Sequence, residues 1–374
     1  MDFQRFRLLV YAYNATGMGP KTLTLRLLDS IPERELSECL FLLPRIPSFE
    51  AHGKRGNVLL LPILPKPFQY LLRMFIDLIL YPALLLLSGA QSSLALANYL
   101  PFPSLGEKTI CIRHSYLLDE EDLAKLGFAR KLLESIRRLL LRLSLIGCKY
   151  VVVQSQRAKE LFSRKYGQRE GLCTMANPIL LDEAKASAKV EMKAKHPIIY
   201  VARYYPHKNH GFLLDLAFKY QDELRDLGFT FYLTLGGKSE VRTFLAEVRG
   251  LALDDLIINL GELTSKEISC CYDRATCLFH PSRSESFGNV LLEAMAKSLP
   301  IVLPAKPYGR ELCKEAALYY PQDSVKEALE TIKEACLCKS TRYRLKENMR
   351  SRVKDFPSLS QWWSKIKALS LDEG

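Results

Sequence analysis

The sequence has no Cys-x-x-Cys pair, although ten cysteines are spread over its 374 residues. Without a set of Cys and His residues at zinc-ligand spacing, a structural zinc site is disfavoured. Several cysteines lie in or beside apolar runs, as Cys148 does next to residues 149–153, so we expect reduced, mostly buried thiols in a cytosolic protein. Residues 1–7 also lack a basic segment followed by an apolar one, and we expect no signal peptide.

Two common phosphate-binding motifs are missing as well. Lys21-Thr22 lacks the preceding glycines of a Walker A loop, and Gly17 and Gly19 have no third glycine that completes a dinucleotide fingerprint. A nicotinamide-dependent oxidoreductase is therefore disfavoured. No basic segment is interleaved with aromatic residues in the way typical of nucleic-acid-binding proteins, so we expect no nucleic-acid partner.

Acidic residues are fewer than basic ones. The chain has 41 Asp and Glu against 53 Lys and Arg, a net charge of +12. Most of the excess lies in residues 1–180, which hold 24 basic and 15 acidic residues, whereas residues 181–374 hold 29 and 26. This charge favours an anionic partner, which could be nucleic acid, a membrane surface or a phosphorylated small molecule.

No charged residue occurs between Leu78 and Gly106. Prolines and polar residues interrupt this run, and only residues 78–90 are densely apolar, fewer than the roughly 20 that cross a bilayer. We therefore predict a helix over residues 68–88 and a buried strand over residues 94–99. Because apolar residues lie on most faces of this helix, it is either deeply buried or in contact with lipid through its outer face.

Short apolar runs alternate with helical patterns along the chain, which is typical of parallel strands joined by crossover helices. The length and a polar segment at residues 182–195 indicate two such α/β domains. We predict Rossmann-like domains over residues 1–180 and 197–355, a linker over 181–196, and a last helix over 356–374 that crosses back to the first domain. Ligands are expected at the carboxyl ends of the strands, in a cleft between two facing domains.

The most informative pattern stands in the second half, after a predicted strand over residues 276–280. Gly288 allows a tight turn there, and the N–H groups of Gly288, Asn289 and Val290 at the start of the next helix form an anion site that fits a diphosphate. Glu285 and Glu293 stand on either side of the turn. Their carboxylates suit the hydroxyl groups of a sugar and of a ribose.

A basic element follows another predicted strand, over residues 197–202. Arg203 and Lys208 stand at its carboxyl end, where they can reach the same diphosphate from the opposite side. Arginine binds phosphate as a planar fork and lysine as a point charge. Together with the glycine turn, the two residues predict a phosphate clamp.

These motifs resemble the family-4 retaining glycosyltransferases of the GT-B fold. The resemblance rests on Tyr200-Val201-Ala202-Arg203 with Lys208-Asn209, on Leu260-Gly261-Glu262-Leu263, and on Pro281-Ser282 followed by Glu285-Ser286-Phe287-Gly288-Asn289-Val290-Leu291-Leu292-Glu293-Ala294-Met295. The last stretch contains the E-x7-E pattern of the family. The resemblance is strong over residues 197–321. The sequence differs from the family at Ser298-Leu299, where members often have a glycine. This difference lies at the end of a helix and does not remove a residue that binds the ligand.

The resemblance implies a role for each matching position of the second domain. Glu285 lies near the donor sugar, Glu293 binds the ribose, and Arg203 and Lys208 hold the diphosphate. The remaining donor-binding positions that it implies are Phe287, Gly288, Asn289 and Val290, with a weaker match at Glu311 in Gly309-Arg310-Glu311.

The first domain resembles the family less closely. Gly17 and Gly19 stand where members keep a glycine-rich loop against the donor phosphates and the acceptor. His114, in Arg113-His114-Ser115-Tyr116, matches the position of the active-site histidine. We interpret His114 and Glu285 as the catalytic contacts with the substrates.

The implied reaction moves a hexose-type sugar from a UDP- or GDP-linked donor to a glycan or lipid-linked acceptor with retention of configuration. The donor binds mainly to the second domain and the acceptor to the first. Cationic groups and helix N–H dipoles stabilise the leaving diphosphate. A pair of aspartates that binds a metal would be expected at the end of a strand, but Asp254-Asp255 lies before its strand. We therefore expect no metal or other cofactor. The alternatives are a nucleotide-sugar epimerase or phosphorylase of the same architecture, and a noncatalytic protein that binds a membrane surface or nucleic acid.

A further pattern in the first half concerns the membrane. Basic residues at positions 130, 131, 137, 138 and 142 are interleaved with leucines and predict a basic amphipathic helix that could lie on an anionic membrane. With the apolar residues 78–90, this predicts a cytoplasmic protein attached peripherally to the inner face of the membrane. A lipid-linked acceptor of surface polysaccharide or lipopolysaccharide assembly would fit such a place.

Overall fold

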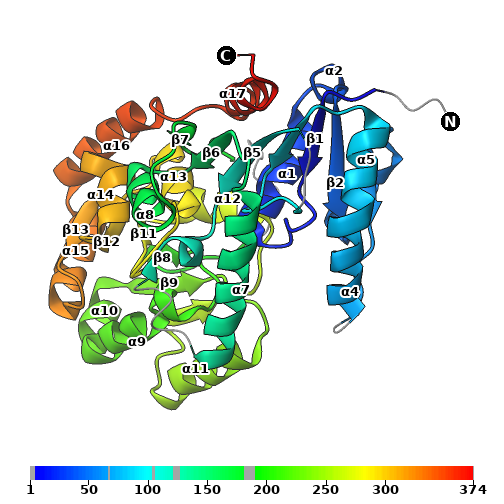
Figure 1. The fold of residues 1–374 in the computed structure, drawn as a ribbon. Coiled ribbons are helices and arrows are strands. Elements are labelled where there is room, and N and C mark those ends of the chain that lie inside the picture. Colours follow the sequence, from blue (N-terminus) through cyan, green and yellow to red (C-terminus); the bar gives the residue numbers. More distant parts are fainter. Residues whose placement is uncertain (1–4, 66–67, 103–105, 121–126, 181–189, 374) are drawn as a thin grey trace. The chain divides into compact units, whose positions relative to one another are not determined.

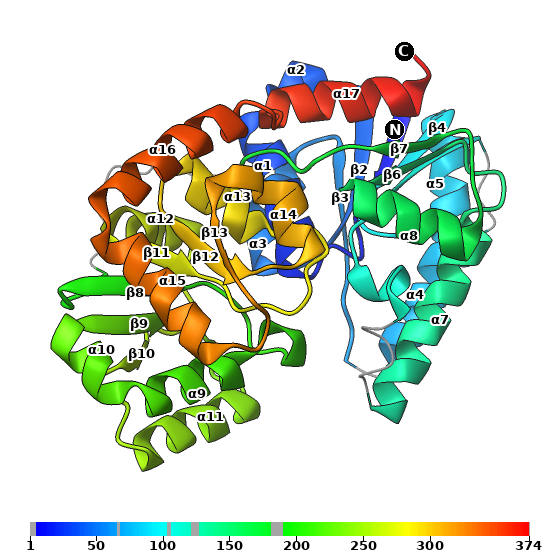
Figure 2. The same ribbon diagram turned by 90° about the vertical axis from the view of Figure 1, so that its left-hand side faces the viewer.

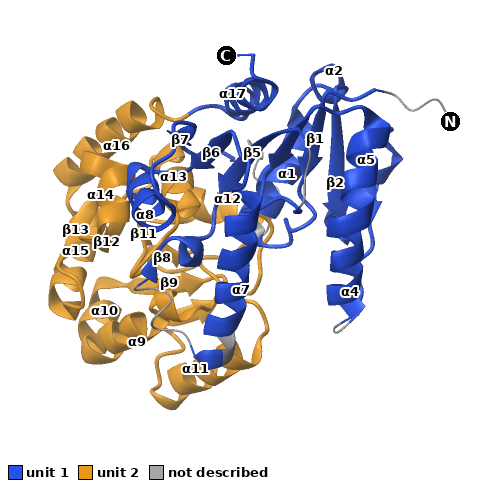
Figure 3. Ribbon diagram, viewed as in Figure 1, with its two compact units in different colours: residues 1–180, 357–374 blue, residues 181–356 orange. Residues whose placement is uncertain are grey.

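A computed structural model describes residues 5–65, 68–102, 106–120, 127–180 and 190–373. The chain divides into two compact units, one of residues 1–180 with 357–374 and one of residues 181–356 (Figure 3). Of the linker predicted over residues 181–196, residues 181–189 lie outside the described part.

The first unit is built on a sheet of seven parallel strands in the order β3-β2-β1-β4-β5-β6-β7. The strands are β1 (Leu8–Tyr11), β2 (Cys39–Pro44), β3 (Val58–Leu61), β4 (Ser92–Ala95), β5 (Glu107–Ile112), β6 (Tyr150–Val153) and β7 (Leu172–Thr174). The order reverses between β1 and β4. At such a switch point the loops after two neighbouring strands diverge and leave room for a ligand.

Helices cover both faces of this sheet. On one face, α1 (Met18–Ser30) and α17 (Leu359–Leu371) share a core that includes Phe41, Trp362 and Trp363. The other face carries the helix of residues 68–88 together with α7 (Phe128–Ser144) and α8 (Gln156–Tyr166). The short elements are α2 (Glu33–Leu36), α3 (Pro47–Glu50), η1 (Ala51–Lys54) and η3 (Ser115–Leu117).

The helix predicted over residues 68–88 is present as three consecutive segments. They are α4 (Phe68–Phe75), the π-helical turn η2 (Ile76–Leu80) and α5 (Tyr81–Ser88), which form one rod in Figure 1. Its 21 residues are long and apolar enough to cross a bilayer, and the mean hydropathy of its most apolar 18-residue window is 1.9. The apolar segment is therefore longer than residues 78–90. Only 22% of its most apolar window is buried, so deep burial, one of the two alternatives, is wrong.

The second unit is built on a sheet of six parallel strands in the order β10-β9-β8-β11-β12-β13. The strands are β8 (His196–Tyr200), β9 (Phe229–Leu233), β10 (Ile257–Asn259), β11 (Cys277–Phe279), β12 (Ile301–Pro304) and β13 (Leu318–Tyr320). The helices are α9 (His210–Lys219), α10 (Gln221–Leu227), α11 (Ser239–Gly250), α12 (Ser265–Arg274), α13 (Asn289–Ala296), α14 (Pro307–Cys313), α15 (Val325–Leu337) and α16 (Lys339–Val353), with short turns η4 (Pro206–Lys208) and η5 (Lys314–Ala316). Helices α9, α11 and α15 share one core with the strands, and α15 covers β12 and β13 (Figure 2).

Two parallel α/β units confirm the predicted fold class. The differences are local. The strand predicted over residues 94–99 is shifted toward the amino end in β4 (Ser92–Ala95), and the short strands β7 and β13 have no counterpart in the prediction. The ten cysteines all lie in the described part and are free thiols, seven of them buried.

Candidate active site

The second sheet reverses its strand order between β8 and β11, which pair in parallel. The loops after these two strands therefore start side by side at the carboxyl edge, where open α/β sheets usually bind ligands. Arg203 and Lys208 follow β8, and Glu285 follows β11. The backbone N–H of Arg283 donates to the carbonyl of His207 over 2.8 Å, which joins the two loops.

Glu285 is the charged centre of this edge. Its side chain is 10% exposed, and its Oε1 accepts hydrogen bonds from Lys208 Nζ and from His280 Nε2, the latter at 2.8 Å. Burial alone would raise the pKa of Glu285, but the lowering effect of Lys208 and His280 together is larger. The pKa of Glu285 therefore lies well below its usual range. The carboxylate is ionised at neutral pH and acts only as a hydrogen-bond acceptor.

His280 stands at the end of β11 and is fully buried. Burial lowers the pKa of His280, and the neighbouring Glu285 opposes this only in part. The ring is neutral at neutral pH, with its hydrogen on Nε2 because that atom faces the carboxylate. Its Nδ1 and the hydroxyl of Ser282 are buried and have no hydrogen-bond partner within the described part of the chain. Buried polar atoms of this kind indicate a place for a bound ligand or water.

Lys208 is fixed through its backbone as well as its side chain. Its carbonyl accepts a hydrogen bond from the Tyr200 hydroxyl at the end of β8. The next residue, Asn209, adopts a left-handed conformation with φ 59°, and α9 begins directly after it. An ammonium group has three N–H donors. Glu285 takes one of them, which leaves donors for a phosphate oxygen.

The turn before α13 depends on Gly288. This residue has φ 96°, a conformation that side chains disfavour, and an added Cβ would lie 3.1 Å from Leu291 Cδ1. Asn289 and Val290 form the first turn of α13. The N–H groups and the dipole at such a helix start attract an anion, three residues after the ionised Glu285.

Glu293 lies on the second turn of α13. Its Oε2 accepts a hydrogen bond of 2.9 Å from the hydroxyl of Tyr272, a fully buried residue of α12. Burial, and after it the negative charge of Glu293, raise the pKa of Tyr272 well above its usual range. The hydroxyl therefore keeps its proton and holds the carboxylate in one orientation.

Three other predicted residues of the second unit do not join the Glu285 cluster. The guanidinium of Arg203 lies 3.3 Å from Glu262 Oε1, in the loop after β10, so Arg203 and Lys208 pair with different carboxylates. Phe287 is buried and its ring lies edge-on, 6.4 Å from that of Phe356. Glu311, in α14, accepts a bond from Arg352 through its backbone carbonyl.

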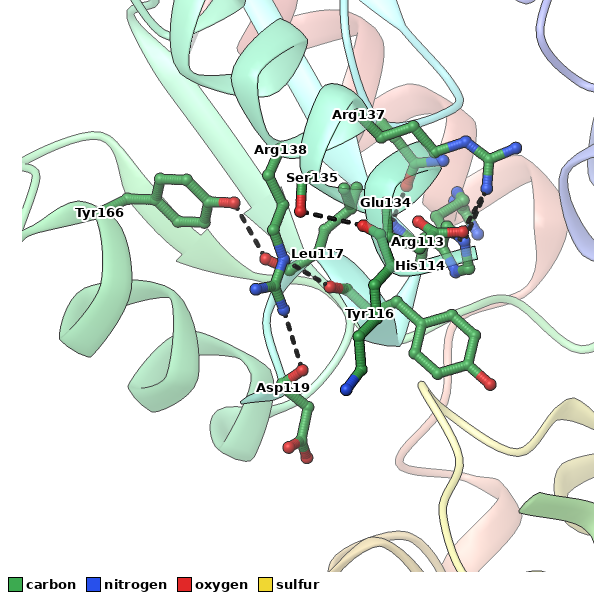
Figure 4. Close-up of polar contacts among 12 residues, drawn as sticks. Arg113, His114, Tyr116, Leu117, Asp119, Glu134, Ser135, Arg137, Arg138 and Tyr166 are labelled. Atoms are coloured by element: carbon green, nitrogen blue, oxygen red, sulfur yellow. Dashed lines mark hydrogen bonds and ion pairs between the residues drawn. The ribbon is translucent and has the colours of Figure 1, made fainter. Parts of the chain in front are cut away.

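In the first unit, His114 follows β5 and lies beside two charged residues of α7 (Figure 4). Its Nε2 is 3.5 Å from Glu134 Oε2 and 3.5 Å from Arg137 Nη1, and Arg137 donates to Glu134 over 2.5 Å. Burial alone would raise the pKa of Glu134, but His114 and Arg137 lower it below its usual range. A buried, ionised carboxylate thus lies beside His114 at the carboxyl edge of the sheet.

Gly17 and Gly19 begin α1, near the switch point of the first sheet. Gly17 has an ordinary φ of −76°, and a Cβ there would meet nothing within 4 Å. The fold itself therefore does not require glycine at this position, which leaves the backbone open to the approach of a ligand. The loops after β1 and β4 are joined by a hydrogen bond from Asn14 Nδ2 to the carbonyl of Ala97.

Three residues that hold the predicted site were not found from the sequence. His280, Tyr272 and Glu134 contact Glu285, Glu293 and His114 respectively. His280 had one usable signal, because it ends a predicted strand directly before Pro281. Tyr272 and Glu134 lie on helices and meet their partners only in the folded chain.

Comparison with known proteins links the second unit to one family. Residues 182–352 match the family model described as glycosyl transferases group 1. A curated relative, the O-antigen chain mannosyltransferase RfbU of Salmonella typhimurium, is 26% identical over 199 residues. That match covers 52% of this chain, and the chain spans about half (53%) of the relative's length.

Three solved structures share the fold over almost the whole chain. They are sucrose-phosphate synthase of Thermosynechococcus elongatus (TM-score 0.76, 15% identity, 98% of both chains), Anabaena HepE in complex with UDP and glucose (0.73, 14%, 97% of this chain and 98% of that one) and WaaG, a glycosyltransferase involved in lipopolysaccharide biosynthesis (0.71, 15%, 97% and 99%). The predicted GT-B fold is thereby confirmed. The match of residues 182–352 links the second unit to the glycosyl transferases group 1, the family that its E-x7-E pattern predicts.

Proposed function

We propose that this protein transfers a hexose from a nucleotide-diphosphate sugar to a glycan or lipid-linked acceptor, with retention of configuration, in the assembly of a surface polysaccharide or lipopolysaccharide. The observation that carries the proposal is the placement of Glu285. A buried, ionised carboxylate stands at the switch point of the second sheet, three residues before the glycine that starts α13. Hydroxyl-binding and phosphate-binding groups thus lie side by side, as a sugar diphosphate requires.

The donor occupies the second unit in this account. Glu285 accepts hydrogen bonds from the sugar hydroxyls, and Glu293, held by Tyr272, accepts them from the ribose. The remaining donors of Lys208 and the start of α13 bind the diphosphate. Because Glu285 is ionised, it also stabilises positive charge that develops on the sugar ring, but it has no proton to give.

The reaction breaks the bond between the anomeric carbon and the diphosphate oxygen and forms a bond from that carbon to the oxygen of an acceptor hydroxyl on the same face. The hydroxyl proton passes to the departing diphosphate. The leaving diphosphate gains charge, which Lys208 and the N–H dipoles of α13 stabilise. We assign the acceptor to the first unit, at the edge where His114 lies beside Glu134 and Gly17 leaves the backbone open. Two relatives support the substrate class: one is a mannosyltransferase of O-antigen chains, and HepE is seen with UDP and with UDP-glucose.

A thermal-shift screen of UDP- and GDP-linked hexoses tests the donor, because a ligand that binds the native state raises the apparent melting temperature. The donor that stabilises the protein is then incubated with candidate acceptors, and the product is analysed by mass spectrometry and by NMR of the anomeric proton. A glycosylated acceptor of retained configuration supports the proposal. Epimerisation of the nucleotide sugar without any acceptor would instead assign an epimerase, and release of a sugar phosphate from a glycan and inorganic phosphate would assign a phosphorylase.

A further inference from the structure

Two helices on one face of the first sheet carry a row of exposed apolar residues, while several of their charged residues face inward. In an ordinary helix of a soluble domain the apolar stripe faces the core. The helix of residues 68–88 and helix α7 both depart from this rule. Both pack on the same sheet face, since Ile76, Tyr81, Leu141 and Leu145 belong to one core cluster.

Helix α7 shows the inversion most clearly. Its exposed stripe consists of Phe128, Leu132, Ile136 and Leu139, at helical spacing, and Phe128 is 84% exposed. Its inward face contains Glu134 and Arg138, both buried. The guanidinium of Arg138 donates to the carbonyls of Tyr116 and Asp119 over 2.9 and 3.0 Å, and Figure 4 shows it turned toward that loop. Arg138 is therefore not part of the outer basic face that the sequence predicts.

The helix of residues 68–88 repeats the pattern. Six of its exposed apolar residues are Phe68, Leu71, Met74, Phe75, Ile79 and Leu86, of which Leu71 and Leu86 are 66% and 68% exposed. Arg73 and Asp77 face inward. They form an ion pair, and the Arg73 guanidinium lies 5.3 to 5.5 Å from the ring centres of Tyr11, Tyr13 and Tyr99. The Tyr11 hydroxyl donates to Asp77 over 2.6 Å.

Both apolar faces are thus on one side of the unit. Figures 1 and 2 show the two helices running in roughly the same direction, with their first residues at the same end. Apolar side chains exposed to water are unfavourable, and clusters of them on a protein surface mark sites of interaction with proteins or membranes.

We propose that these two faces form a docking surface for an anionic lipid bilayer, into which the exposed side chains dip without crossing it. Protein interfaces are about as apolar as other protein surface and have a polar rim. Here, by contrast, the helix of residues 68–88 has no charged residue other than the inward-facing Arg73 and Asp77. Lys131, beside Leu132, and the exposed Arg142 lie on α7, and residues 1–180 carry a net +9, which complements anionic headgroups. Aromatic side chains such as Phe68, Tyr70 and Phe128 are typical of the interfacial layer.

Buried contacts argue against a membrane span, although the helix of residues 68–88 has sufficient length. Asp77 is held by Tyr11 of β1, and the Tyr81 hydroxyl donates to Ser93 of β4 over 2.7 Å. A helix that left the sheet to cross a bilayer would break these bonds and would carry Arg73 and Asp77 into lipid, which is costly. The helix therefore stays on the sheet and offers one face to the membrane.

Flotation with liposomes tests the proposal and needs neither a donor nor an acceptor, so its failure is separate from a failure of the proposed function. The full-length protein is mixed with vesicles of phosphatidylcholine alone, or with about 30% phosphatidylglycerol, at low and high salt. We expect binding to the anionic vesicles that weakens with salt, because exposed charges are screened. The triple variant Phe128→Ser, Leu132→Gln, Ile136→Gln should lower the bound fraction about tenfold or more at unchanged charge.

The matched control removes three exposed apolar residues of the second unit: Phe218→Ser, Leu337→Gln and Tyr343→Gln. It should bind like the wild type, and circular dichroism should show that both variants fold. Equal binding of the two triple variants would overturn the proposal, as would absence of the wild type from the floating fraction. So would a dimer in sedimentation that the α7 variant alone converts to monomer, since the face would then belong to a second copy.

Discussion

His280 places its Nε2 2.8 Å from Oε1 of Glu285, and the Lys208 ammonium contacts the same oxygen. His280 and Glu285 are five positions apart in the loop between β11 and α13. This short loop fixes the carboxylate at the point where the strand order reverses. One donor is neutral and buried and the other is charged. Together they keep Glu285 ionised inside a largely buried site.

The variant Glu285→Gln retains the shape of the side chain and removes its charge. Transfer should fall by about 100-fold or more, in the range seen when one group that stabilises a transition state is lost. Nucleotide affinity should change less, because Glu285 contacts the sugar in this account. Steady-state rates and nucleotide titration on the same preparation check both parts. Wild-type transfer rates in this variant would refute the role given to Glu285.

Lys208→Ala should destabilise the protein as well as weaken the donor. The change leaves the buried Glu285 carboxylate without its cationic partner, which typically costs about 3–5 kcal/mol in free energy of unfolding. The double variant Lys208→Ala, Glu285→Gln should recover part of this loss because no charge is left unpaired. Urea denaturation of the three proteins measures it. Additive losses in the double variant would show that the two side chains are not coupled.

The stability of the second unit should fall in mild acid because of His210. This residue is buried between the rings of Tyr200 and Tyr204, and burial lowers the pKa of His210 to about 3. Its pKa in the unfolded chain is about 6.5. Between these two pKa values the histidine is protonated in the unfolded state and neutral in the native state. The free energy of unfolding is therefore greatest above about pH 6.5 and decreases as the pH falls toward 3.

At pH 5 the expected loss from His210 is about 2 kcal/mol relative to pH 7, from 1.4 kcal/mol for each pH unit below 6.5. The variant His210→Phe cannot take up the proton. The difference in unfolding free energy between pH 7 and pH 5 should be smaller in this variant by about that amount. An identical pH dependence in both proteins would contradict the assignment.

Glu134→Gln tests the arrangement around His114. The ionised carboxylate lies beside both His114 and Arg137, so its loss should lower kcat about tenfold and leave nucleotide affinity in the second unit unchanged. Ser135→Ala, at the next position, removes an exposed hydroxyl bound to the Lys131 carbonyl and serves as the control. Equal rates for both variants would mean that Glu134 has only a structural role.

Much of the second unit could be predicted because its signals are local. Gly288 marks the start of α13, and the helix start predicted at residues 288–290 is observed. Glu285 and Lys208 could be selected because each follows an apolar strand of recognisable pattern. The two residues are 77 positions apart in the sequence, and they come into contact only because β8 and β11 pair in parallel.

The remainder depends on tertiary contacts. Nothing in the sequence around Tyr272 of α12 indicates a role, because its contact with Glu293 forms only in the folded chain. Likewise, the leucines and arginines of α7 predict an amphipathic helix, but periodicity does not say which face turns inward. Arg138 turns inward because the carbonyls of Tyr116 and Asp119 are there to receive it. β13, of three residues, is too short to give a periodic signal.

The most direct measurement of the central claim is calorimetric titration of UDP and GDP into the wild type and into Glu293→Ala, with Glu347→Ala as a control that removes an exposed glutamate of α16. We expect one of the two nucleotides to bind, with the same affinity for the wild type and for the control. Glu293→Ala should bind it about 10- to 100-fold more weakly, because hydrogen bonds to a charged group contribute about 1.5–3 kcal/mol. Unchanged affinity in Glu293→Ala, or no binding of either nucleotide to the wild type, would contradict the claim.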